Sequence, residues 1–163
     1  ERTAESFAER GAIGSIVCLR PTLIVRPEKA PEILAELATL TPTEGHPGFA
    51  VDAPRYGDLP AHRCYVTSRD AAAAFRAALL AETVGFARYV IAARDTLGGV
   101  EALPWIDRIY GDRPEVRDTA WFAERRNASP LDSRAAERDL GWIARDDWPA
   151  VIRAATGGRQ AGE

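Results

Sequence analysis

The segment that most constrains the fold is Ser15–Pro27, which reads SIVCLRPTLIVRP. Its first half is a continuous apolar run, Ile16–Leu19, followed directly by an Arg-Pro pair. A short apolar run beside turn residues is typical of a strand buried on both faces, as in a parallel sheet. Because proline lacks the N–H that a ladder needs, we expect pairing to end at Pro21. Ligands of open α/β sheets bind beyond the carboxyl ends of strands, so Pro21–Val25 is expected to lie at a ligand site.

The composition is that of one ordinary globular unit. The chain has 163 residues, 46% of them hydrophobic and 28% charged, which is long enough for a domain with a real core. The formal net charge of −3 gives no electrostatic reason to expect nucleic acid or an anionic membrane as a partner. No apolar run approaches the length of a membrane span. The strong preference for Arg over Lys, with abundant Ala, suggests a GC-rich, bacterial genome.

The cysteines, histidines and tryptophans suggest structural roles. Cys18 and Cys64 lack metal-type spacing, so we expect two buried free thiols in a reducing cytoplasm. His46 and His62 have no partners at ligand spacing, so no metal site is predicted. The tryptophans are expected to pack in the core and between helices: Trp105, Trp121, Trp142 and Trp148.

Periodicity and turn residues predict the remaining elements. Strands are expected at 15–19, 64–67 and 89–92, and helices at 1–10, 31–40, 71–82, 103–110, 133–140 and after 147. Residues 112–129 are expected to be irregular, and Gly85 is expected to break the chain. In the helix 71–82 we expect Ser68 or Asp70 to act as the cap, and the large apolar side chains to point inward: Phe75, Leu79 and Leu80.

The opening segment also carries a family resemblance. Leu19-Arg20-Pro21, followed by Ile24-Val25-x-Pro27-Glu28, resembles the "LRP…VxGP" segment of the NAD-dependent epimerase/dehydratase family, the extended short-chain dehydrogenase/reductases. Arg26 stands where that family usually has glycine. In relatives the segment ends against the nicotinamide, so the resemblance implies three cofactor-binding residues: Pro21, Thr22 and Leu23.

A second segment, Arg63–Ala71, resembles a substrate-binding segment of the same family. Arg63 falls where UDP-sugar epimerases hold the substrate diphosphate, and a guanidinium fork suits phosphate oxygens. The alternative is that Arg63 is a solvated surface residue. The family's central residues are replaced here by Thr67-Ser68-Arg69, whereas Asp70 is retained and is expected to be structural. Arg113 resembles a second phosphate-binding arginine of some relatives, at an altered spacing.

Two more segments follow in the family's order. Tyr89–Thr96 resembles the last parallel strand and its turn, where Asp95 is expected to have a turn or cap role. Ser129–Trp142 resembles the C-terminal "DxSKAxxxLGWxP" signature, which we interpret as a helix capped by Asp132 and closed by Gly141. Four matches in order argue against the alternative of a freestanding α/β domain with chance similarity.

Two family motifs are not found in the sequence. There is no G-x-x-G-x-x-G loop after a first strand, and Lys29, the only lysine, has Val25 rather than tyrosine four residues before it. In relatives a glutamate follows the catalytic lysine by four residues, and Glu1 matches that position. We therefore expect the chain to be a C-terminal half whose catalytic pair lies just before Glu1, and to be inactive alone.

The resemblance implies an α/β fold. It predicts the C-terminal part of a doubly wound, Rossmann-like parallel sheet with a small, mainly helical substrate-binding domain. The sheet-associated parts are expected at 1–30 and 84–97, the substrate domain largely at 31–83 and 98–158, and a tail at 159–163.

The predicted function follows from the same resemblance. It is the binding of a sugar or nucleotide-sugar in an NAD(P)-dependent epimerase, dehydratase or oxidoreductase, with Arg63 and Arg113 toward the substrate, and with NAD or NADP as the cofactor. A homodimer of the intact protein is a further implication. The alternative is a non-catalytic relative that senses a dinucleotide or binds a protein, which the altered Thr67-Ser68-Arg69 segment favours.

Overall fold

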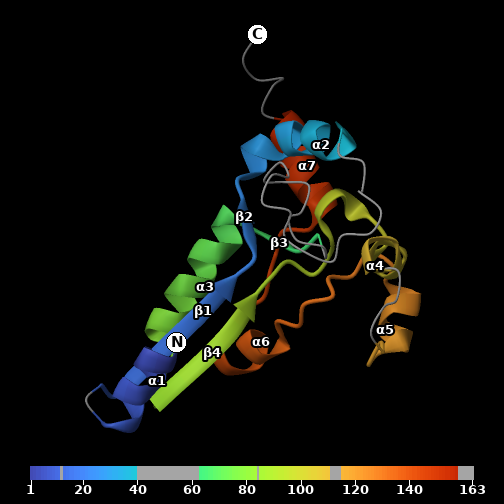
Figure 1. The fold of residues 1–163 in the computed structure, drawn as a ribbon. Helices are drawn as coiled ribbons and strands as arrows, with labels where there is room; N and C mark the ends of the chain where they lie inside the picture. The colour runs from blue at the N-terminus through green and yellow to red at the C-terminus, as the bar shows by residue number, and fades with distance from the viewer. Residues whose placement is uncertain (12, 40–62, 84, 111–114, 158–163) are drawn as a thin grey trace.

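The computed structural model describes residues 1–11, 13–39, 63–83, 85–110 and 115–157 (Figure 1). Its strands are β1 (Ser15–Pro21), β2 (Leu23–Val25), β3 (Tyr65–Thr67) and β4 (Gly85–Ile91). Its α-helices are α1 (Arg2–Glu9), α2 (Ala30–Thr39), α3 (Ser68–Leu80), α4 (Ala102–Tyr110), α5 (Thr119–Glu124), α6 (Arg134–Leu140) and α7 (Trp148–Gly157). Two short 3₁₀ helices are η1 (Pro27–Lys29) and η2 (Leu97–Gly99).

The strands form two parallel pairs, so the chain is an α/β protein. β1 pairs with β4, and β2 pairs with β3. The β1–β4 register ends at the pair Pro21 and Ile91, which confirms that pairing ends at this proline. The chain then changes partner at Thr22 and continues as β2 beside β3 (Figure 1). The prediction that Gly85 breaks the chain is wrong, because Gly85 is the first residue of β4 and adopts a φ of 75°.

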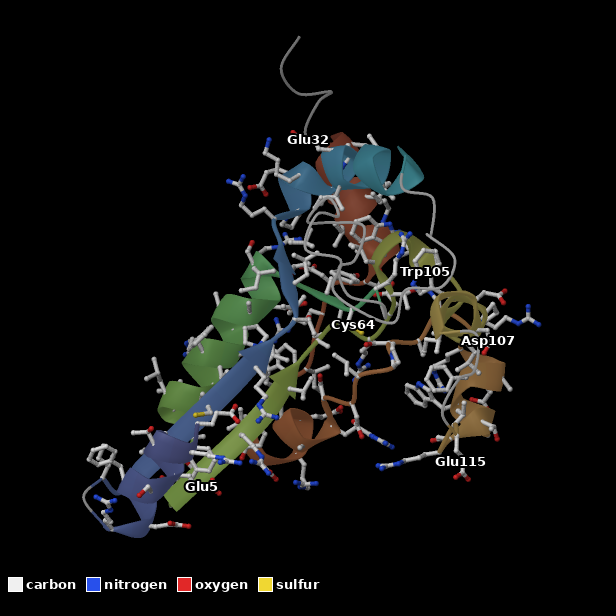
Figure 2. The ribbon with its side chains drawn as sticks, in the orientation of Figure 1. Glu5, Glu32, Cys64, Trp105, Asp107 and Glu115 are labelled. Atoms are coloured by element: carbon white, nitrogen blue, oxygen red, sulfur yellow. The ribbon has the colours of Figure 1, made fainter. Side chains whose placement is uncertain are left out.

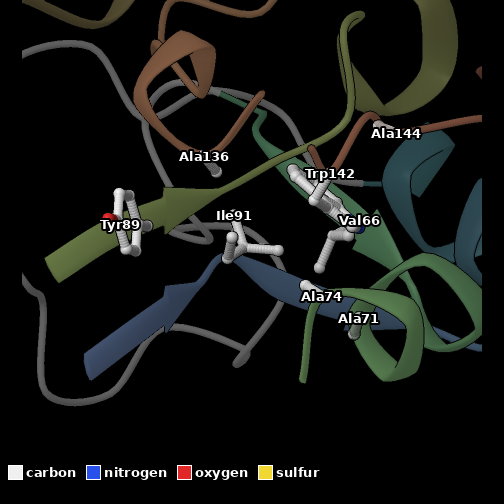
Figure 3. Close-up of a cluster of buried hydrophobic side chains, with 8 residues drawn as sticks. All are labelled: Val66, Ala71, Ala74, Tyr89, Ile91, Ala136, Trp142 and Ala144. Carbon is white, nitrogen blue, oxygen red and sulfur yellow. The ribbon is translucent and has the colours of Figure 1, made fainter. Parts of the chain in front are cut away.

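One hydrophobic cluster fills the space between the β1–β4 pair and two helices. It combines Tyr89 and Ile91 of β4 with alanines of α3 and α6, and Trp142 closes it beside Val66 (Figure 3). Small side chains on the helices let their backbones approach the strands closely, so the larger strand residues supply most of the volume.

The prediction that Phe75, Leu79 and Leu80 point inward is wrong. These side chains are 51%, 85% and 65% exposed. The buried face of α3 is instead made by Ala71 and Ala74. Both faces of α3 carry apolar residues at helical spacing. The face with the larger side chains was expected to be the buried one, and it is the exposed one. The facing sheet already supplies large side chains, and it accepts only the alanine face at close range.

A second cluster lies beyond β2, where α7 packs against η1 and α2. Its buried members include Val25, Leu97 and Val151. At its centre the rings of Tyr65 and Trp148 meet edge to face, with their centroids 5.4 Å apart. This cluster joins the N-terminal and C-terminal parts of the described chain, as Figure 1 shows for α2 and α7.

The helix ends differ in detail from the sequence predictions. Neither Ser68 nor Asp70 caps α3, because the hydroxyl of Thr67 accepts the N–H of Asp70 at 3.1 Å. Asp147 accepts the N–H of Ala150 at 2.7 Å and so caps α7. The helix α5 lies inside the segment that was expected to be irregular, where the carboxylate of Asp118 accepts the N–H of Trp121.

Gly141 closes α6 in the predicted way, and we expect its replacement to be costly. Its φ is 63°, and no atom lies within 4 Å of the position that a Cβ would take. Gly141→Ala should therefore lower the free energy of unfolding by about 1 kcal/mol, from backbone strain alone. Urea unfolding measures this. Gly14→Ala is the matched control, because Gly14 has open space and no positive φ. Equal effects of the two substitutions would contradict the prediction.

In the described ranges, no helix combines the length and the apolar character that a membrane crossing requires.

Candidate functional site

The predicted cofactor-binding residues lie where the two strand pairs meet. Pro21 is the last residue of β1, and Leu23 is the first residue of β2. Between them, the backbone N–H of Thr22 donates to the carbonyl oxygen of Ile91 at 3.0 Å, and its hydroxyl donates to the same oxygen at 3.3 Å. Thr22 thus holds the carboxyl ends of β1 and β4 together.

These contacts limit what the three residues offer a dinucleotide. Pro21 has no N–H, and both donors of Thr22 are directed at Ile91 within the fold. Leu23 pairs with Tyr65 and packs against the second cluster. The segment therefore fits a cofactor by apolar contact at the strand ends rather than by hydrogen-bond donation. Its cofactor role stays a prediction.

Arg63 is held in place by its backbone before β3 begins. Its carbonyl oxygen accepts the N–H of Leu97 at 2.7 Å, and the next residue, Cys64, forms an antiparallel bridge with Thr96. Arg63 has a φ of 49°, the only positive φ of a non-glycine residue in the described chain. Such a conformation costs about 1–2 kcal/mol for an L-residue. Strain of this kind is typical of functional sites, where the surrounding structure imposes it.

The side chain of Arg63 is buried against α4. Only 7% of the residue is exposed, so the alternative that Arg63 is a solvated surface arginine is wrong. Its guanidinium carbon lies 4.0 Å from the ring centroid of Trp105, in cation–π contact. The positions of Trp105 and Cys64, away from α1, can be followed in Figure 2.

The Gly98–Gly99 turn borders this guanidinium. A Cβ added at Gly98 would lie 3.4 Å from Nη1 of Arg63, and both glycines have positive φ values. A Cβ at Gly98 would therefore be in van der Waals contact with the guanidinium, and the positive φ would strain the backbone.

Arg63 is a buried cation without a carboxylate counter-charge in the described part of the chain. The ion pairs of the described residues involve other arginines and Lys29. Burial lowers the pKa of the Arg63 guanidinium from its ordinary value. Arginine nevertheless stays protonated in proteins, so Arg63 is a positive charge in a poorly solvated place. Arg113 lies outside the described residues.

Asp70 has the structural role that was predicted, although it does not cap its own helix. Its Oδ2 accepts the backbone N–H groups of Arg145 and Asp146, each at 3.0 Å. Its carbonyl oxygen accepts the indole N–H of Trp142, also at 3.0 Å. Burial raises the pKa of the Asp70 carboxyl, while the two backbone hydrogen bonds oppose that rise. Asp70 therefore anchors the chain after α6 to α3.

Asp95 also has the structural role that was predicted. Its Oδ1 accepts the hydroxyl of Tyr65 at 2.8 Å, and its Oδ2 accepts the N–H of Trp148, the first residue of α7, also at 2.8 Å. Burial is the main cause that raises its pKa. Since both oxygens are engaged within the fold, Asp95 is part of the scaffold that places α7.

Trp105 is a site residue that the sequence does not predict, because packing is the commoner role of tryptophan. The indole face indeed packs, but against Arg63. The only local signal was the glycine pair shortly before α4, which indicates a close backbone approach.

No group of three His, Cys, Asp or Glu residues within the described ranges is arranged to hold a metal ion. The candidate site consists of a buried arginine with a positive φ, an indole ring and a glycine turn. A guanidinium that is held in one place can donate charge-assisted hydrogen bonds to an anionic group.

No family model, no curated protein and no solved structure matches this chain.

Proposed function

We propose that the chain is the substrate-binding part of an NAD(P)-dependent sugar or nucleotide-sugar epimerase, dehydratase or oxidoreductase. In this proposal β1 and β4 belong to a doubly wound parallel sheet, and Arg63 binds an anionic group of the substrate. The single observation that carries the anion-binding role is the buried Arg63 guanidinium stacked on Trp105. A buried cation is costly unless an anion compensates it, so its retention here favours an anionic ligand.

The strand arrangement supports the same proposal. β1 and β4 are parallel, and their carboxyl ends meet at Thr22. Residues 93–97 come after β4 in the chain and run beside β3 and Arg63, because the N–H of Ala93 donates to Tyr65 and the N–H of Leu97 donates to Arg63. In open α/β sheets a ligand binds beyond the carboxyl ends of the parallel strands. The segment 93–97 starts at that end of β4 and reaches Arg63, so a ligand bound there would lie on the same side of the sheet as Arg63.

In this proposal the cofactor supplies the hydride chemistry and the residues of this chain orient the substrate. When bound, NAD(P) supplies a hydride acceptor or donor for a sugar carbon. Residues of this chain orient the substrate: Arg63 holds its anionic group by charge-assisted hydrogen bonds. The Thr22 contacts keep the two strand ends fixed beside the reacting region.

Replacement of Arg63 tests the proposal in the full-length gene product. Arg63→Ala should weaken nucleotide-sugar binding by about 10- to 100-fold, the usual effect of losing hydrogen bonds to a charged group. Calorimetry with a panel of nucleoside diphosphate sugars measures this effect, and NAD(P)H absorbance follows turnover. Arg125→Ala is the matched control, because Arg125 also stacks on a tryptophan, Trp121, but is exposed.

The outcomes separate the proposal from its alternative. Unchanged affinity in Arg63→Ala would contradict the role of Arg63. Binding without any hydride transfer would favour the non-catalytic sensor. The coding sequence ahead of Glu1 gives an independent test, since a glycine-rich loop and a Tyr-x-x-x-Lys pair there would support the enzyme.

A further inference from the structure

We propose that Trp105 is a second substrate-binding residue, whose indole N–H and the Arg63 guanidinium together bind one phosphate-type oxyanion. The inference rests on the proposed function and deepens it, since it assigns a second donor to the same site. Among the described residues, the Trp105 Nε1 has no acceptor and the Arg63 guanidinium has no carboxylate partner. The two groups lie in contact, and a single anionic ligand would satisfy both.

The first observation concerns the edge of the Trp105 ring. Its Nε1 is buried and has no hydrogen-bond partner among the described residues. An unpaired buried N–H costs about 1–3 kcal/mol, so native structures rarely keep one without a reason. Trp142 shows the usual situation for a buried tryptophan, because its Nε1 donates to the carbonyl oxygen of Asp70.

The second observation concerns the face of the same ring. The Arg63 guanidinium lies 4.0 Å from the ring centroid. Both groups are hydrogen-bond donors without any acceptor atom, so neither can satisfy the other. The acceptor that serves both must come from a third group, and it gains most if it is negatively charged. A phosphate has several oxygens and can accept from the guanidinium and from the indole at once.

The third observation is that the donors are fixed before a ligand arrives. The carbonyl oxygen of Arg63 accepts the N–H of Leu97, and the next residue, Cys64, forms a bridge with Thr96. These two contacts fix the backbone of Arg63. Trp105 lies in α4, whose Ala102 N–H donates to Arg126 and whose Ile106 is buried. A preorganised pair of donors loses little side-chain entropy on binding.

The test uses Trp105→Phe, which keeps an aromatic ring for Arg63 and removes the indole N–H together with the five-membered ring that carries it. Trp121→Phe is the matched control, because Trp121 stacks on Arg125 at 4.2 Å but is exposed. Inorganic pyrophosphate and uridine diphosphate are the probes, titrated into the full-length gene product at constant ionic strength. The thermal unfolding transition of each ligand-free variant shows that the variant is folded. The rise of its midpoint on adding ligand gives a second measure of affinity.

We expect Trp105→Phe to bind both probes about tenfold more weakly, as for a lost hydrogen bond to a charged acceptor. Trp121→Phe should change the affinity by less than about threefold. Full affinity in Trp105→Phe, with weakened binding in Arg63→Ala, would overturn the role of Trp105 and leave the proposed function standing. Full affinity in Arg63→Ala would overturn the proposed function. Failure of the unmodified protein to bind either probe would overturn both.

Discussion

Trp148→Ala should lower the free energy of unfolding by about 3–5 kcal/mol, the usual cost of removing a buried tryptophan side chain. Trp148 is 5% exposed and lies in the second cluster, where α7 meets β2, η1 and α2. The substitution removes the edge-to-face contact with Tyr65 and leaves a cavity between segments that are distant in the sequence. The backbone N–H that donates to Asp95 remains, so the loss reports packing.

Urea unfolding of the full-length protein checks this expectation. Trp121→Ala is the control for removal of a tryptophan, because Trp121 is 38% exposed and contacts Arg125. Its cost should stay near 1 kcal/mol, the strength of an exposed cation–π contact. Similar costs for the two substitutions would show that α7 does not depend on Trp148.

Asp70→Ala should lower the free energy of unfolding by about 2–5 kcal/mol, because it leaves two backbone N–H groups in partly buried hydrogen bonds without their acceptor. Both groups, from Arg145 and Asp146, donate to the single oxygen Oδ2. Asp70→Asn is the informative partner, since an asparagine whose oxygen takes the Oδ2 position keeps both bonds. We therefore expect Asp70→Asn to lower the free energy of unfolding by less than half as much as Asp70→Ala does. Equal losses in the two variants would contradict the geometry.

The pH dependence of Asp70→Asn gives a further check of the same site. Burial raises the pKa of Asp70 in the folded state above its ordinary value of 3.8. The folded protein thus binds more protons at this site than the unfolded chain, so its stability falls as pH rises through that interval. Asparagine does not titrate. The loss of stability caused by Asp70→Asn should therefore become smaller as the pH rises above about 4, as urea unfolding at a series of pH values would show.

Local signals determined several elements from the sequence alone. The apolar run before Pro21 predicted β1, and the missing N–H of that proline explains where pairing with β4 ends. Gly141 predicted the end of α6, because only a left-handed residue closes the helix there. In each case the deciding residue acts on its own backbone or on its immediate neighbours.

Other features of the fold depend on partners that the sequence does not identify. The buried face of α3 was predicted wrongly because both faces are apolar, and the facing strands select the alanines. The helix α5 was missed because the segment around it is polar and its N-cap, Asp118, is one of several aspartates. The family resemblance pointed to Arg63 by analogy, but it could not show that Arg63 is buried.

The sequence by itself therefore determined where β1 ends, where α6 closes and that the chain is α/β with parallel strands. Only the tertiary structure decided which face of α3 is buried, which oxygen of Asp70 holds the chain after α6, and that Trp105 lies against Arg63. The physical reason is the distance along the sequence over which each interaction acts. Turn and ladder chemistry acts between neighbouring residues, whereas burial and cation–π contact arise when β3 and α4 are brought together by the segment 93–97.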